Sequence, residues 1–320
     1  MTVQPVVALT GATGFIGGTL LSQLSAAGST VRALHRRLPS RTLPSLPGVE
    51  WIEGDLADAA ALRMLVAGSD AVVHCAGTVR GARHSDFDRI NAEGAARVAE
   101  VAAGLPNAPR FLLMSSLAAR MPQLSDYAGS KRRGEDALKA APKNLRWTVL
   151  RPPAVYGPGD RELLPLFRWV ARGIAPLPAD GGGRFSLIYV DDLASAVVRW
   201  LAADVGHGRT FEVDDGHPGG YDWDTVLGAA ARVLRAGGSM RRLSVPVGAL
   251  RMAATANLAA ARLLGYAPML TPGKVREITH MDWLCDSHDF ALATGWRAAV
   301  GLEAGLARAY GTQEHGRHDR

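Results

Sequence analysis

The first half of the chain alternates between two hydrophobic periodicities. Short apolar runs of the kind found in buried strands are separated by longer segments in which apolar residues recur at helical spacing. The apolar runs lie at residues 6–10, 30–34, 49–53, 71–75, 110–114 and 146–150, and the helical segments include residues 59–66, 86–103 and 127–141. This alternation predicts an α/β fold of the Rossmann type, a doubly wound parallel sheet with helices on both faces.

The pattern becomes less regular after Arg151, where prolines and glycines interrupt the chain repeatedly. Strand-like and helix-like stretches return at residues 185–190, 193–203 and 302–310. We therefore expect a dinucleotide-binding Rossmann domain at residues 1–151 and a smaller, irregular substrate-binding part at residues 152–311, with room for the chain to cross between the two. The polar residues 312–320 are expected to form a flexible tail.

The most membrane-like segment, residues 247–264, is too polar to span a bilayer. It is interrupted by Arg251, Asn257 and Arg262, and a spanning helix needs about 20 apolar residues. We expect no membrane span, and predict an amphipathic helix suited to an interface.

Cysteine use and the N-terminus favour a reducing compartment. Cys75 and Cys285 belong to no paired-ligand spacing, so neither a disulfide framework nor a structural metal site is indicated. The first residues lack the basic region of a secretory signal. A cytoplasmic location is the expectation.

Charge adds little to this picture. The 320 residues, enough for about two domains, include 36 Lys and Arg against 30 Asp and Glu, for a net charge of +6 and a pI near 9.7. Residues 120–151 contain eight basic residues and three acidic ones. Aromatic residues are not interleaved with them as in a nucleic-acid groove, so we expect no nucleic-acid partner.

A glycine-rich turn follows the first predicted strand, where the helical pattern begins. Gly11, Gly14 and Gly17 stand in the run that starts at Thr10. Glycine permits a tight turn and lets backbone N–H groups approach a pyrophosphate at a helix N-terminus. Within a strand–helix–strand unit, this spacing predicts dinucleotide binding.

The end of the second strand favours NADP(H) over NAD(H). NAD sites carry an acidic residue there for the ribose hydroxyl, but this chain has Arg36 and Arg37 and no carboxylate. Guanidinium groups suit a 2′-phosphate. The alternative is that both arginines belong to a solvated loop.

Tyr127 and Lys131 are spaced to lie side by side on one helical face. A free tyrosine has a pKa near 10, so acid/base work near neutral pH needs a neighbouring cation that favours the phenolate. Lys131 can supply that charge. Alone, this spacing is common on surfaces, but here Ser115 and Ser116 end the preceding strand, which favours a catalytic site.

These motifs together resemble the extended branch of the short-chain dehydrogenase/reductase family, over nearly the whole chain. The matching runs are Thr10 to Gly18, Asp55 with Leu56, His74 to Gly77, Tyr127 to Lys131, Arg151 to Gly159 and Ile188 to Ala194. The resemblance implies that Tyr127 transfers a proton, that Lys131 tunes it and holds a ribose, and that Ser116 polarises the reacting group. Asn91 would be structural or part of a proton relay.

The same resemblance supplies the other expected contacts. The cofactor would meet Gly11, Thr13, Gly14, Phe15, Ile16, Gly17, Arg36, Arg37, Asp55, Leu56, Ala76, Gly77, Lys131 and Pro153. The substrate would meet Ser115, Val155, Tyr156 and Arg184, although Val155 and Tyr156 suit ordinary core packing equally well. Relatives often dimerise, so a homodimer is a further expectation.

Three functions remain open. The first is an NADP(H)-dependent oxidoreductase acting on a small alcohol or carbonyl substrate. A nucleotide-sugar epimerase or dehydratase is favoured by Arg184, but disfavoured by the ten residues between Ser116 and Tyr127, by Tyr189 in place of a histidine, and by Arg36 with Arg37. A non-catalytic NADP-binding subunit is disfavoured because Tyr127 and Lys131 are both present.

Overall fold

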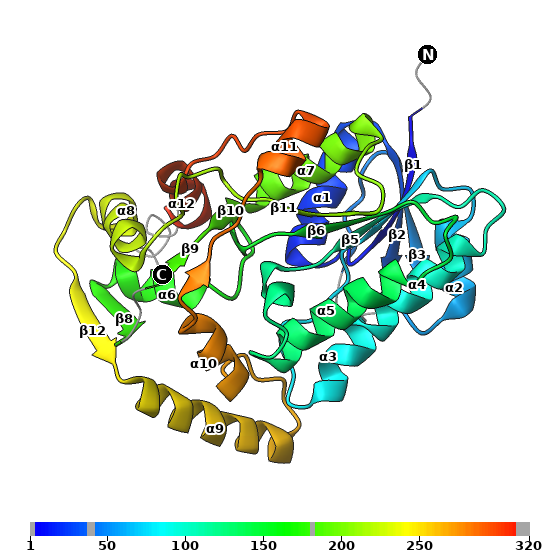
Figure 1. Cartoon of the computed structure of the whole chain (residues 1–320). Coiled ribbons are helices and arrows are strands. Elements are labelled where there is room, and N and C mark those ends of the chain that lie inside the picture. The colour runs from blue at the N-terminus through cyan, green and yellow to red at the C-terminus, as the bar shows by residue number, and fades with distance from the viewer. Residues whose placement is uncertain (1–3, 37–41, 180–182, 312–320) are drawn as a thin grey trace.

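Seven parallel strands form the central sheet of the molecule (Figure 1), in the order β11-β6-β5-β4-β1-β2-β3. The computed structural model describes residues 4–36, 42–179 and 183–311. The strands are β1 (Val6–Thr10), β2 (Thr30–His35), β3 (Val49–Glu53), β4 (Ala71–His74), β5 (Arg110–Met114), β6 (Trp147–Arg151) and β11 (Arg209–Glu212). The order reverses between β1 and β4, as in doubly wound sheets, so the predicted fold class is confirmed.

Helices cover both faces of this sheet because each buries an apolar stripe against it. One face carries α1 (Phe15–Ala26), α7 (Val190–Ala203) and α11 (His288–Thr294). The other carries α2 (Ala59–Val66), α4 (Glu93–Ala103) and α5 (Asp126–Lys139), with α3 (His84–Asn91) beside α5.

A second, smaller core lies beyond the sheet and includes Tyr156, Phe167 and Leu306. Three two-stranded sheets, β10-β7, β12-β8 and β13-β9, belong to this region. Its elements are β7 (Ala154–Tyr156), α6 (Leu164–Ala171), β8 (Ile174–Pro178), β9 (Arg184–Phe185), β10 (Leu187–Tyr189), α8 (Trp223–Arg235), β12 (Arg241–Val245), β13 (Asp282–Trp283) and α12 (Leu302–Tyr310).

Two helices connect this region back to the sheet. In Figure 1, α9 (Val247–Leu264) runs along the lower edge, and α10 (Pro272–Ile278) lies above it. Arg262 in α9 donates to the Ala82 carbonyl, and Arg276 in α10 donates to the Leu124 carbonyl. Among the described residues, no helix is long and apolar enough to cross a membrane.

The chain crosses back to the sheet after residue 151. β11 pairs with β6, and α7 packs on α1. The central sheet therefore takes one strand and one covering helix from residues beyond 151. The division into domains at that residue stays a prediction.

Two predicted elements are divided in the structure. The helix expected at 86–103 is two helices, α3 and α4, which meet at Ala92. The Asn91 side chain is bonded to Thr78 and Ser130, and α5 approaches so closely that a Cβ on Gly134 would lie 2.3 Å from the Asn91 carbonyl. The strand expected at 185–190 is divided into β9 and β10, because Ser186 turns inward and bonds Asp214.

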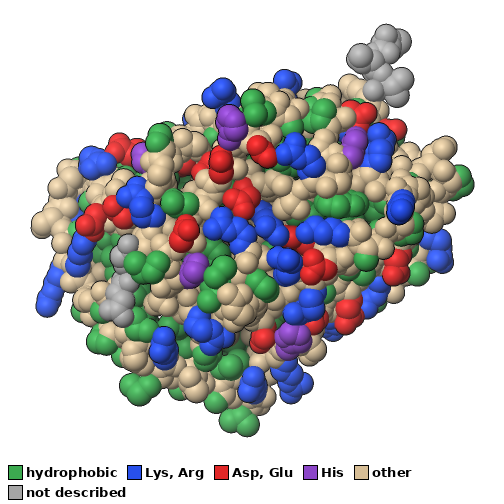
Figure 2. Space-filling view, viewed as in Figure 1, with side chains coloured by type: hydrophobic (Ala, Val, Ile, Leu, Met, Phe, Trp, Pro, Cys, Tyr) green, Lys and Arg blue, Asp and Glu red, His purple; other side chains and the backbone are tan. Residues whose placement is uncertain are grey.

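Figure 2 shows that side-chain types are distributed unevenly over one face of the molecule. Red and blue side chains mix across its centre, whereas green hydrophobic side chains with blue ones between them gather along the lower edge, where α9 lies in Figure 1. This edge differs in character from the rest of the face.

Candidate active site

The turn between β1 and α1 has a shape that only glycine permits. Gly11 has φ +75°, and a Cβ there would lie 2.6 Å from the Ala76 nitrogen at the end of β4. A Cβ on Gly17 would lie 2.1 Å from the Gly11 carbonyl oxygen. The first turn of α1 therefore packs directly against the strand ends.

The N-terminus of α1 is suited to a dinucleotide pyrophosphate. Gly14 caps the helix, no side chain caps it within the described residues, and no acidic residue stands in its first turn. Its first N–H groups and the positive end of the helix dipole are therefore available to an anion. Thr13, Phe15 and Ile16 surround this turn and are half-buried. These residues fit the phosphate portion of NAD or NADP.

The expected contacts to the rest of the cofactor lie along the same edge of the sheet. Arg36 follows β2 and is exposed, whereas Arg37 lies outside the described residues. The Asp55 carboxylate accepts from the backbone N–H groups of Ala57 and Asp58. Leu56 is 9% exposed and packs against Gly94, so only a small part of its side chain could contact a cofactor.

Tyr127 and Ser116 are brought together at the carboxyl end of β5. Ser116 begins the short helix η1 (Leu117–Arg120), and Tyr127 lies in the first turn of α5, which Ser125 caps. Burial raises the pKa of Tyr127 to about 12, a hydrogen bond with the Ser116 hydroxyl lowers it, and the Glu277 carboxylate raises it. Tyr127 is therefore a protonated phenol at neutral pH.

Lys131 lies one turn further along α5, with its ammonium group buried. The Lys131 Nζ donates to the Met114 carbonyl at 2.9 Å, and burial lowers the pKa of this lysine to about 8. A Cβ on Gly77 would lie 3.1 Å from Lys131 Nζ and 3.1 Å from Asn91 Oδ1. The sequence-predicted residues Gly77, Asn91 and Lys131 thus converge on one point.

The contacts of Asn91 are those of a residue that holds two segments together. Its Nδ2 donates to the Thr78 carbonyl and to Ser130 Oγ, both at 2.9 Å, and its Oδ1 accepts from the Thr78 nitrogen at 2.8 Å. These bonds fix the loop after β4 against α5. The alternative role as a proton relay stays a prediction.

The two serines that end β5 face different surroundings. The Ser115 hydroxyl is buried and donates to Glu135 Oε1 at 2.6 Å. Burial alone would raise the pKa of Glu135, but hydrogen bonds from Arg151 and Ser115 outweigh it and lower this pKa. Ser115 therefore belongs to a buried ion-pair network, and Ser116 is the serine that meets Tyr127.

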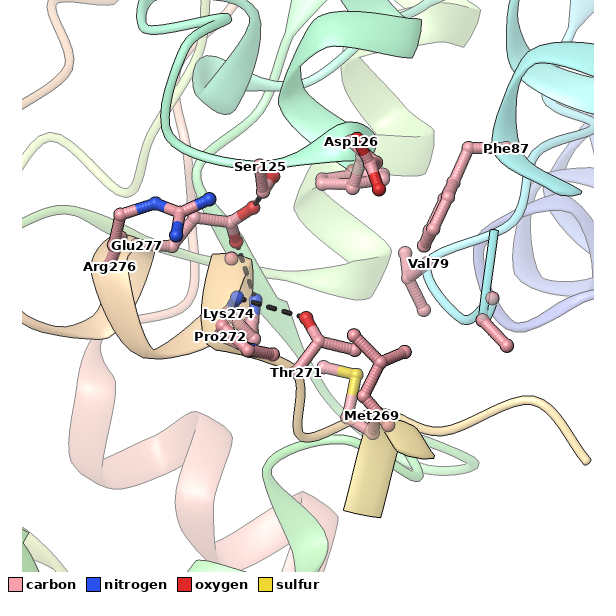
Figure 3. Close-up of a pocket in the computed structure, with 15 residues that line it drawn as sticks. Val79, Phe87, Ser125, Asp126, Met269, Thr271, Pro272, Lys274, Arg276 and Glu277 are labelled. Atoms are coloured by element: carbon pink, nitrogen blue, oxygen red, sulfur yellow. Dashed lines mark hydrogen bonds and ion pairs between the residues drawn. The ribbon is translucent and has the colours of Figure 1, made fainter. Parts of the chain in front are cut away.

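A pocket opens next to Tyr127, between the loop after β4 and the α9–α10 segment (Figure 3). Phe87, Leu258 and Met269 supply apolar walls. On the α10 side, Lys274 Nζ donates to Glu277 Oε2 at 2.9 Å, and the Ser125 hydroxyl donates to Glu277 Oε1. Lys274 and Glu277 were not predicted as site residues, because no recognisable sequence motif surrounds them.

Three expected substrate contacts lie elsewhere. Tyr156 is 1% exposed in the second core, and its hydroxyl has no hydrogen-bond partner among the described residues. Val155 is half-buried and packs against the central core. Arg184 donates to the carbonyls of Gly219 and Gly220 and does not line the pocket.

The remaining residues that are expected to contact the cofactor lie at the strand ends. Ala76 donates its backbone N–H to Thr10 Oγ1, which bonds the buried His74. Burial and the Lys131 charge lower the pKa of His74 to about 3, so this histidine is neutral. Pro153 is half-buried just after β6. In the described part of the chain no group of three metal-ligating side chains is found.

The chain is similar to known oxidoreductases along most of its length. The sequence profile of the NAD dependent epimerase/dehydratase family matches residues 7–214. A ceramide reductase of Caulobacter vibrioides is 38% identical over 286 residues, which are 89% of this chain and 88% of that protein. A 2-alkyl-3-oxoalkanoate reductase of Stenotrophomonas maltophilia is 32% identical over 59% of this chain and 63% of that protein.

Solved structures share the fold. MoeE5 in complex with UDP-glucuronic acid and NAD superposes with a TM-score of 0.72 at 22% identity, over 95% of this chain and 97% of that one. At this identity the likeness concerns the fold alone.

Proposed function

Because the chain belongs to the NAD dependent epimerase/dehydratase family, as an oxidoreductase of the extended short-chain type, we propose that it is an NADP(H)-dependent reductase or dehydrogenase. It transfers a hydride between the nicotinamide and an alcohol/carbonyl substrate. The proposal includes a cytoplasmic location, which the sequence favours.

One arrangement carries this proposal: Tyr127 lines a pocket and has the Ser116 hydroxyl beside it, with Lys131 one turn away on the same helix. When bound, the cofactor supplies the hydride. The Ser116 hydroxyl positions the substrate oxygen, and Tyr127 gives that oxygen a proton. Because burial raises the pKa of Tyr127 to about 12, the phenol keeps its proton at neutral pH and has one to donate.

Lys131 has a binding role in this scheme. Its Nζ bonds the Met114 carbonyl and lies beside Gly77, at the edge where the cofactor ribose is expected. The ammonium can donate there to a ribose hydroxyl. The pKa of Tyr127 depends on burial, on the Ser116 hydroxyl and on the Glu277 charge, so tuning of the phenol by Lys131 stays a prediction.

The preference for NADP(H) rests on the residues that follow β2. Arg36 is exposed there, and no carboxylate stands between Ala33 and Arg37 to repel a 2′-phosphate. Replacing Arg36 with Gln is expected to raise KM for NADPH while leaving KM for NADH unchanged.

The pocket favours a carbonyl carried on an apolar chain. Val79, Phe87, Leu258 and Met269 line it, beside charged side chains that include Lys274 and Glu277. The two relatives described above are both reductases by name. A nucleotide-sugar substrate has less support, because Arg184 is bonded to backbone carbonyls away from this pocket.

The test is the net consumption of cofactor. We expect NADPH to be oxidised in equal amount to an added 2-alkyl-3-oxoalkanoate, faster than NADH, with UDP-glucose causing no turnover. Conversion of UDP-glucose into its epimer without net cofactor change would overturn the proposal. Equal rates with NADH and NADPH would overturn the cofactor assignment alone.

A further inference from the structure

The helix α9 is unusually exposed for its length. Of its 18 described residues, only Ala254 and Ala261 are buried. Met252 is 71% exposed and Leu263 86% exposed. A surface helix normally turns its polar side to solvent, so an outward face of this composition needs an explanation.

The outward face of α9 is a continuous apolar stripe. Met252, Ala256, Ala259 and Leu263 follow one another at helical spacing and are all exposed. Leu264, 77% exposed, lies beside the stripe at the C-terminal end of the helix, on the flank opposite the one that carries Arg262. The stripe contains no polar side chain.

The opposite side of α9 reaches the pocket. Leu258 lines the pocket, together with Met269 from the segment that follows the helix. Asn257 donates to the Leu270 carbonyl, which fastens that segment to the helix. One helix therefore presents an apolar stripe to the exterior and a pocket wall to the interior.

The stretch of sequence that contains α9 carries charge of a single sign. Residues 225–276 contain no acidic residue. Their basic residues are Arg232, Arg235, Arg241, Arg242, Arg251, Arg262, Lys274 and Arg276. These eight exceed the net charge of the whole chain, +6.

Some of these charges have intramolecular partners. Arg232, Arg242 and Lys274 form ion pairs with acidic residues outside this segment. Arg251 and Arg262 belong to α9 itself, are exposed, and lie along one flank of the apolar stripe. Arg262 has no acidic partner among the described residues and uses its Nε to donate to the Ala82 carbonyl. An apolar stripe with a basic flank is the pattern of helices that lie in a membrane interface.

We propose that α9 binds the surface of an anionic phospholipid bilayer, with the stripe from Met252 to Leu263 in the interface and Arg251 and Arg262 against the headgroups. Apolar burial and attraction to anionic lipid act together in such helices. A second copy of the chain is a poorer occupant, because two such faces would bring like charges together. The proposal concerns a surface and is independent of the proposed reaction.

This orientation places the pocket beside the bilayer. Since Leu258 and Met269 form its wall on the α9 side, an apolar molecule leaving the membrane at α9 would meet that wall first. The helix would then serve as both an anchor and one side of an entrance.

The experiment is sedimentation of the full chain with vesicles. Vesicles of phosphatidylcholine alone are compared with vesicles that contain about 30% phosphatidylglycerol, at low salt and at about 0.5 M NaCl. The test variant is Met252→Glu with Leu263→Glu, and the matched control is Met64→Glu with Leu292→Glu. The control leucine and methionine are 73% and 57% exposed, on α11 and α2.

We expect the unaltered chain to sediment with the anionic vesicles, and salt to weaken this binding. The α9 variant should lose about tenfold in vesicle affinity, while the control binds like the unaltered chain and both variants keep its thermal melting temperature. Failure of the unaltered chain to sediment, or equal loss in the control, would overturn the proposal. So would a dimer, seen by sedimentation velocity, that the α9 variant converts to monomer.

Discussion

The carboxyl edge of the central sheet and the α9 helix are held in place in opposite ways. At the sheet edge, Asn91 and Lys131 are buried, and each bonds to backbone carbonyls of neighbouring segments. In α9 only two described side chains are buried, and large apolar groups face outward.

This difference separates two tasks. Proton transfer depends on atoms held within a few tenths of an ångström, which a hydrogen-bonded and buried site provides. A helix that meets a variable surface needs no such precision. Substitutions at the sheet edge should therefore change the reaction or the stability, and those on the α9 stripe should change neither.

The largest effect is expected from Tyr127→Phe. Removing the hydroxyl deletes the proposed acid and its bond to Ser116, so kcat should fall by about 1000-fold, while cofactor binding persists. Steady-state kinetics with NADPH measures kcat, and a fluorescence titration measures cofactor binding. The matched variant on α9, Met252→Ala, should retain full kcat. Full activity in Tyr127→Phe would contradict the catalytic role of Tyr127.

A smaller effect, on stability, is expected from Arg151→Ala. Arg151 forms a two-pronged ion pair with Glu135, at 2.8 and 2.6 Å, and the Glu135 side chain is fully buried. Loss of Arg151 leaves this buried carboxylate with only the Ser115 hydroxyl and the longer pair to Lys139 at 3.4 Å, which should lower the free energy of unfolding by about 3 kcal/mol. Urea denaturation measures this.

The matched comparison for stability is again Met252→Ala on α9, which should shift the free energy of unfolding by less than about 0.5 kcal/mol. Equal destabilisation by Arg151→Ala and Met252→Ala would remove the contrast between the two regions.

The smallest effect is expected from pH. Burial lowers the pKa of Lys131 to about 8, so its ammonium is charged below that pH and loses its proton above it. If the charged form holds the ribose, kcat/KM for reduction should be level below pH 8 and fall about tenfold per unit above it. The pKa of Tyr127, about 12, is too high to cause this fall. A rate unchanged up to pH 10 would contradict the role of Lys131.

The regular elements were predictable where one periodicity dominates. The segments 6–10, 49–53, 59–66, 110–114, 247–264 and 302–310 have the predicted bounds in the structure. The division of the predicted helix into α3 and α4 at Ala92 was not predictable. It depends on hydrogen bonds of Asn91 with Thr78, in the loop after β4, and with Ser130, on α5. Periodicity reports local preference and carries no information on such tertiary bonds.

The site was predictable in its motif residues and less so in its pocket. Ser116 follows β5, and Tyr127 and Lys131 lie in the first turns of α5, so one strand end and one helix place all three in the same region. The positions of Tyr156 and Arg184 could not be predicted from the sequence. A tyrosine in the core and a tyrosine in a pocket have the same sequence signal, and so do a hydrogen-bonded arginine and a free one. Lys274 and Glu277 reach the pocket through α10, whose position depends on the whole path of the chain after β12.

The strand β11 pairs with β6 but follows it by almost 60 residues in the sequence, and this separation affects folding during synthesis. During synthesis from the N-terminus, β6 leaves the ribosome before β11 has been synthesised. The backbone groups on one edge of β6 therefore stay unpaired until β11 emerges. The nascent sheet can be completed only after the intervening strands and α7 have emerged. A fragment released at residue 151 would keep that open edge permanently, and we expect it to aggregate where the full chain folds.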